Sequence, residues 1–166
     1  MGLNRIRAWL AAIALAHTLG SAGTARAQAV HDPQGKVLVG GSAGVTVRDG
    51  STAGTIGLQV GYAVIDGLVP GIRGMVLFGD FGGGELAGTL FYTPPVTWPV
   101  VPFVTAEVGN RWEESTSGPL LGGGGGLHLG SPAARFGVRA GVVYNRWFVL
   151  GGIDIIRPMA LVSVRF

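Results

Sequence analysis

Hydrophobic and polar residues alternate with a period of two along most of the chain from residue 36 onward. Eight alternating segments are separated by short stretches rich in Gly, Pro, Asp and Ser. They cover 36–47, 55–64, 71–79, 85–93, 102–112, 120–129, 135–145 and 158–166. Period-two alternation bounded by turn-forming residues is typical of β-strands. The pattern therefore predicts an all-β chain of eight strands.

One face of almost every predicted strand is apolar, while the other face is small or charged. A water-soluble sandwich buries such an apolar face, whereas a membrane barrel turns it toward lipid. The aromatic residues favour the barrel, because they fall at the ends of the predicted strands, on the apolar face. In membrane barrels the strand ends lie at the depth of the lipid headgroups, where aromatic rings are enriched. The residues of the two predicted aromatic girdles are Tyr62, Phe78, Tyr92, Trp112, Phe136, Tyr144 and Phe166.

The composition is unusual for a soluble domain. Only 13% of the residues are charged, where about 25% is usual, and 31 of the 166 residues are Gly. After residue 27 no run of ~18 apolar residues is present that would form a membrane-spanning helix. A closed barrel is the other structure that satisfies every backbone polar group in lipid. We therefore predict an antiparallel, up-and-down transmembrane β-barrel of eight strands.

The N-terminal segment has the layout of a secretory signal peptide. Arg5 and Arg7 precede an apolar stretch over 8–19, and small residues then lead to Ala25-Arg26-Ala27, an A-x-A cleavage pattern. The apolar stretch is too short for a membrane anchor, which needs ~20 residues. We predict a cleavable signal peptide over 1–27, with cleavage before Val30 as the alternative. Residues 28–166 would then form one barrel domain in the outer membrane of a Gram-negative cell.

Charge and cysteine content exclude further classes of function. The chain has 12 Lys and Arg against 9 Asp and Glu, but Arg5, Arg7 and Arg26 belong to the predicted signal peptide. The remaining chain is balanced, so it offers no electrostatic footprint for nucleic acid. Cys is absent, which excludes disulfides and thiolate metal sites. We expect no cofactor and no metal.

The last predicted strand carries a pattern of its own. Ala160, Val162, Val164 and the final Phe166 share its apolar face. This strand resembles the recognition signal of barrels inserted by the outer-membrane barrel assembly machinery. The whole segment 28–166 resembles the small eight-stranded barrels of the outer-membrane protein A transmembrane-domain and opacity-protein group. The resemblance implies a monomer that meets periplasmic chaperones, the assembly machinery, outer-membrane lipid and lipopolysaccharide.

The polar face of the strands indicates what fills the barrel. An eight-stranded barrel has room inside for side chains only, and buried charges must be paired. We predict a luminal polar network that plugs the barrel, and we expect Glu107 and Arg139 to pair across the glycine-rich sixth strand. A gated polar path is the alternative for the same residues. The predicted luminal residues are Gln59, Arg73, Glu85, Glu107, Arg111, His128, Arg135, Arg139 and Arg165.

Two connections on the side away from the termini, 113–119 and 146–157, are expected to be longer or richer than the turns near the termini. Glu113 and Glu114 in the first connection suggest a solvated acidic loop, with binding of divalent cations as the alternative. The second connection is unusually apolar. It either extends the last hairpin beyond the membrane, shields the mouth of the barrel, or contacts a partner or a hydrophobic ligand.

Enzymatic activity is the remaining alternative, because small outer-membrane barrels include lipid A-modifying enzymes. A deacylase of this type needs His and Ser two residues apart near the outer rim. His128 is instead followed by Ser131 and lies toward the periplasmic end, and His31 precedes the first strand. We therefore expect a non-enzymatic outer-membrane protein of structural or surface-interaction type. A small pore or hydrophobic-ligand uptake barrel is the first alternative, and a lipid A-modifying enzyme is the second.

Overall fold

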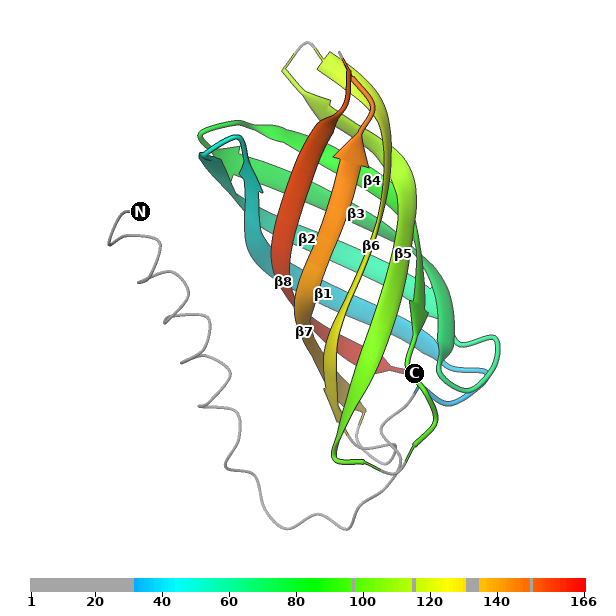
Figure 1. Cartoon of the computed structure of the whole chain (residues 1–166). Coiled ribbons are helices and arrows are strands. Elements are labelled where there is room, and N and C mark those ends of the chain that lie inside the picture. The colour runs from blue at the N-terminus through cyan, green and yellow to red at the C-terminus, as the bar shows by residue number, and fades with distance from the viewer. Residues whose placement is uncertain (1–31, 97, 115, 131–134, 150) are drawn as a thin grey trace, which may run out of the picture.

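Each of the eight alternating segments forms a β-strand in the structure, a computed structural model that describes residues 32–96, 98–114, 116–130, 135–149 and 151–166. Every strand pairs antiparallel with the next, and the last returns to the first to close a barrel (Figure 1). The predicted fold class is thus confirmed. The predicted signal peptide lies outside the described residues. The strands are β1 (Val37–Arg48), β2 (Ser51–Tyr62), β3 (Leu68–Gly79), β4 (Gly83–Tyr92), β5 (Val100–Glu113), β6 (Thr116–Gly130), β7 (Phe136–Trp147) and β8 (Ile153–Arg165).

Alternation along the strands separates the inside of the barrel from the outside. In β2, Thr55 and Gln59 are buried, whereas Ile56, Leu58 and Val60 are exposed. Successive side chains of a strand point to opposite faces of the sheet. All around the barrel, most large apolar side chains point outward and most charged side chains point inward, which is the reverse of the arrangement in a soluble protein. Among the described residues no helix is long and apolar enough to cross a bilayer.

The seam between β1 and β8 closes the barrel. Ala43 lies opposite Ala160, and the backbone N–H of Phe166 donates to the carbonyl oxygen of Val37 at 3.0 Å. The ladder of paired residues is interrupted between Met159 and Ile156 of β8. Pro158 lies in this gap, and it has no N–H to donate. On its other side, β8 remains paired with β7 throughout.

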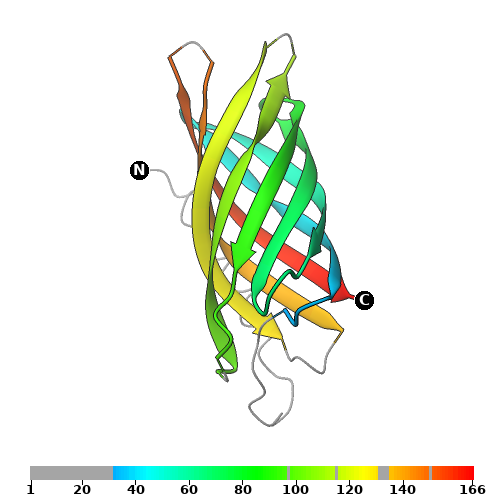
Figure 2. The ribbon, with the colours of Figure 1, turned by 90° about the vertical axis from the view of Figure 1, so that its right-hand side faces the viewer.

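The connections on the side away from the termini are short, which corrects the prediction of longer loops there. β1 and β2 are joined by Asp49 and Gly50 alone, both with positive φ (46° and 85°). The segments predicted as loops continue as strands, because β5 pairs with β6 up to Glu113 and Thr116, and β7 pairs with β8 up to Trp147 and Ile153. These two hairpins project beyond the tips of the other two (Figures 1 and 2). The apolar connection between β7 and β8 thus extends the last hairpin.

The barrel interior contains apolar side chains as well as charged ones, which the sequence analysis did not anticipate. The largest apolar group lies between the termini and the middle of the barrel, and within it the rings of Phe91 and Phe103 are 5.8 Å apart. Its other members are Leu38, Ala63, Val69, Val143, Met159 and Leu161. Inner residues of β8 show the layers in order: Arg165 near the termini, Leu161 and Met159 next, and Arg157 beyond them.

Candidate functional site: the barrel interior and its mouth

The structure places eight of the nine predicted luminal residues on the inner face of the barrel, all of them buried. Arg135 is the exception. It is exposed in the bend before β7, and it is therefore not a luminal residue. The predicted seventh strand began one residue too early, because pairing of β7 with β8 starts at Phe136. The carbonyl oxygen of Arg135 still accepts from the backbone N–H of Arg165 at 2.8 Å, but its side chain does not enter the lumen.

Four buried side chains form a network in the middle of the barrel, here called the central network: Arg73, Glu85, Glu107 and Arg157. Arg73 forms ion pairs with both glutamates. Arg157 does the same, with Nη1 at 3.0 Å from Oε1 of Glu85 and Nη2 at 2.6 Å from Oε2 of Glu107. Each charge thus has two partners of opposite sign, which is the condition for holding buried charges without a large desolvation penalty.

The central network crosses the lumen from one wall to the opposite wall. Arg73, Glu85 and Glu107 come from the neighbouring strands β3, β4 and β5, whereas Arg157 comes from β8. In a ring of eight strands β4 and β8 lie opposite each other. The ion pair between Arg157 and Glu85 therefore spans the barrel.

A second group, here called the terminal network, lies at the end that carries the termini: Asp32, Arg139 and Arg165. Asp32 precedes β1 and is completely buried. Its Oδ2 accepts a hydrogen bond from Nη2 of Arg139, and Nε of Arg165 lies 3.3 Å from its Oδ1. The expected pairing of Glu107 with Arg139 is therefore wrong, because the apolar layer separates them and each has a nearer partner.

A third group, here called the mouth network, lies at the opposite end: Arg48, Arg111 and Glu113. Glu113 forms ion pairs with both arginines, and Nε of Arg111 donates to its Oε1 at 2.8 Å. Arg111 also approaches Glu85, with 3.8 Å between Nη1 and Oε2, and so connects the mouth and central networks. Glu113 is the last residue of β5 and points into the barrel, so the prediction of a solvated acidic loop is wrong for this residue. Glu114 is exposed.

Four charged residues of these networks were missed from the sequence: Asp32, Arg48, Glu113 and Arg157. Arg157 was assigned to the connection 146–157, since the predicted last strand began at Pro158, although Ile153, Ile155 and Arg157 continue the parity of β8. That parity is the signal that would have found it. Asp32 lies outside any strand and folds back into the lumen, with its carbonyl oxygen accepting from the N–H of Gly67 at 2.9 Å. No periodic pattern indicates such a contact.

The outer wall carries the predicted aromatic residues. All seven are exposed, and they lie at or near strand ends on the apolar side. Ala160, Val162 and Val164 lie on the same outer face of β8, and the exposed Phe166 follows directly after its last residue. An apolar exterior around a charged interior is the surface of a barrel that spans a membrane. Whether the rings anchor the barrel and β8 directs its assembly stays a prediction.

His128 lies on the inner face of β6, opposite Arg139 of β7 in the register, and is completely buried. It is thus at the end that carries the termini, away from the mouth. Among the described residues no three His, Cys, Asp or Glu side chains are grouped so as to hold a metal ion.

Comparisons with known proteins point to the same architecture. No protein-family profile matches the chain, and no curated protein matches it. The crystal structure of Neisserial surface protein A is similar, with 16% sequence identity and a TM-score of 0.64 over 79% of this chain and 96% of that one. The N-terminal β-barrel domain of Pseudomonas aeruginosa OprF is also similar, with 16% identity and a TM-score of 0.60 over 81% of this chain and 100% of that one. The chain therefore has the fold of the small eight-stranded outer-membrane β-barrels.

Proposed function

We propose that this chain is an integral outer-membrane protein of structural or surface-interaction type, with its lumen closed by ion pairs and with no enzymatic activity. The mouth would face the cell exterior and the terminal network would face the periplasm. The observation that carries the proposal is the central network, because Arg157 reaches from β8 to Glu85 on the opposite wall. Ions would have to displace these paired charges in order to pass.

The small size of a void beside the terminal network supports a closed lumen. Below the mouth, a void of about 10 Å³ lies among Leu38, Gln59 and Arg139. Such a void is about the size of one water molecule. The apolar layer around Phe91 and Phe103 adds a second obstacle, because ions do not readily enter an apolar layer.

The position of His128 supports a non-enzymatic role. A lipid A-modifying site must reach lipid from the outer wall of the barrel near the outer rim. His128 is buried inside the barrel at the other end. Mass spectrometry of lipid A from cells that express the protein tests this point. An unchanged lipid A is expected, and a modified lipid A would show that the enzymatic alternative is correct.

Recording in planar bilayers tests the closed lumen. The wild-type protein is expected to show no steady conductance. Removing the crossing pair together, by Arg157→Ala with Glu85→Ala, avoids a lone buried charge and is expected to produce conductance steps. Paired truncation outside the lumen, Arg146→Ala with Asp154→Ala, is the matched control, because this ion pair lies on the exposed surface. Steady conductance of the wild-type protein would contradict the proposal and favour the pore.

A further inference from the structure

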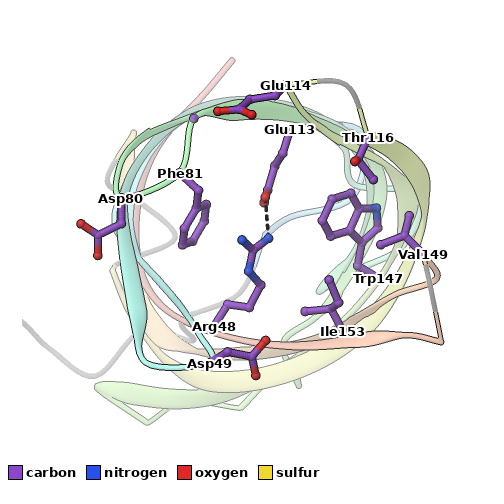
Figure 3. Close-up of a pocket in the computed structure, with 11 residues that line it drawn as sticks. Arg48, Asp49, Asp80, Phe81, Glu113, Glu114, Thr116, Trp147, Val149 and Ile153 are labelled. Atoms are coloured by element: carbon purple, nitrogen blue, oxygen red, sulfur yellow. Dashed lines mark hydrogen bonds and ion pairs between the residues drawn. The ribbon is translucent and has the colours of Figure 1, made fainter.

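The mouth of the barrel contains a cavity of about 440 Å³. It is lined by the tips of all four hairpins that lie opposite the termini, including Asp49, Phe81, Glu114 and Val149 (Figure 3). Binding sites for small ligands usually measure roughly 300–1,000 Å³. The cavity thus has the size of a small-molecule site, and neither the ion-pair plug nor the fold accounts for it.

The charge of the lining favours a cation. Among the described lining residues there are four carboxylates and one cationic side chain, Arg48. Glu113 is already engaged by Arg48 and Arg111. Asp49 and Glu114 stand at the rim on opposite sides of the opening (Figure 3), exposed and with no hydrogen-bond or ion-pair partner among the described residues. A cation that enters the cavity therefore meets the two carboxylates at the rim before it reaches the ion pair of Arg48 and Glu113.

Aromatic side chains form two facing walls of the cavity. The guanidinium carbon of Arg48 lies 4.4 Å from the centre of the Phe81 ring, and Trp147 stands on the other side (Figure 3). Val149 and Ile153 extend the apolar surface beside Trp147. Aromatic faces attract organic cations. Arg48 shows that a flat cation fits against Phe81. Trp147 is buried, and the guanidinium carbon of Arg111 lies 5.6 Å from the centre of its ring, so the partly buried Val149 and Ile153 supply the apolar surface for the body of a ligand.

We propose that the mouth cavity binds a small organic cation, an ammonium group carried on an apolar or aromatic body. The body would pack against Val149 and Ile153, beside Trp147, and the charge would lie between the rim carboxylates of Asp49 and Glu114. A metal ion fits less well, because Glu113 is occupied by two arginines and the described residues hold no group of three metal ligands. The binding requires neither a closed nor a conducting lumen, so it goes beyond the proposed function.

Isothermal titration calorimetry of the protein folded in non-ionic detergent tests this proposal, with phenethylammonium as the probe and protein-free micelles as the blank. Phenethylammonium is expected to bind, more weakly at high salt, because the rim charges are screened. 2-Phenylethanol has the same shape without the charge, and phenylacetate carries the opposite charge. Both are expected to bind much more weakly. Equal binding of the alcohol and the ammonium, or no binding of the ammonium, would overturn the proposal.

Neutralising the rim tests which residues hold the charge. Asp49→Asn combined with Glu114→Gln keeps side-chain size and is expected to weaken phenethylammonium binding about tenfold. Asn also tolerates the positive φ of residue 49. The matched control is Asp66→Asn with Asp154→Asn, which removes the same charge outside the cavity lining and is expected to leave binding unchanged. Unchanged binding in the rim variant, or an equal loss in the control, would contradict the proposed site. Circular dichroism checks that both variants remain folded barrels.

Discussion

Buried arginines and glutamates in this barrel are stable only as networks. Arg73 and Arg157 each contact both Glu85 and Glu107, so no charge of the central network depends on one partner. The loss of any single charge leaves the others buried without full compensation. Such losses cost far more than the net stabilisation that an intact pair contributes.

Glu107→Gln is the residue-scale prediction. It preserves shape but removes the anion that faces both arginines, and we expect it to lower the free energy of unfolding by about 3 kcal/mol. Urea unfolding in detergent measures the change. Glu114→Gln, the same substitution at an exposed residue that has no partner in the described part of the chain, is expected to change stability by less than ~0.5 kcal/mol. Equal stability of the two variants would show that the central network does not stabilise the fold.

Tight hairpins join the strands at the mouth. Asp49 and Gly50 both have positive φ, the conformation of the two-residue turns that match the twist of paired strands. The sequence Asp-Gly between alternating segments is a strong hairpin signal.

In β6, a Cβ on Gly124 would clash with the carbonyl oxygen of Val142. The glycine run therefore allows β6 and β7 to lie close together.

Gly50→Ala is the element-scale prediction. Nothing lies within 4 Å of a Cβ at this position, so the cost arises from the positive φ of 85° alone. We expect a loss of about 1 kcal/mol, measured by urea unfolding. Gly41→Ala is the matched control, because its Cβ also meets nothing within 4 Å and its φ is not positive. A loss that is no larger at Gly50 than at Gly41 would contradict the role assigned to this turn.

At the scale of the whole molecule, an apolar exterior encloses a charged interior. Leu58, near the middle of β2, is 71% exposed on the outer wall, and Tyr62 lies at the end of the same strand. In a soluble protein this exposure would favour aggregation. In a bilayer the same side chains contact acyl chains, and the paired charges remain inside the barrel.

Leu58→Arg is the prediction at this scale. A charge on the lipid face at mid-depth is expected to cost about 2–4 kcal/mol in a bilayer. Val64→Arg, on an exposed residue beyond the end of β2, is expected to cost less than about 1 kcal/mol. Reversible folding into lipid vesicles measures both values. A similar cost at both positions would mean that depth along β2 does not correspond to depth in a bilayer.

The sequence by itself determined the number of strands, their antiparallel order and, apart from Arg135, the face to which the residues of the predicted strands point. This follows because alternation with a period of two is a local property, so Arg73, Glu85 and Arg111 could be placed inside the barrel by parity. Parity was not applied to Asp32, which lies before the first strand, or to Arg157, which lies just before the predicted start of the last strand. Parity also does not predict which charged side chains form ion pairs with one another. Only the closed barrel, with the tilt and register of its strands, decided that Arg157 meets Glu85 across the lumen and that Asp32, not Glu107, pairs with Arg139, because these contacts join residues far apart in the chain.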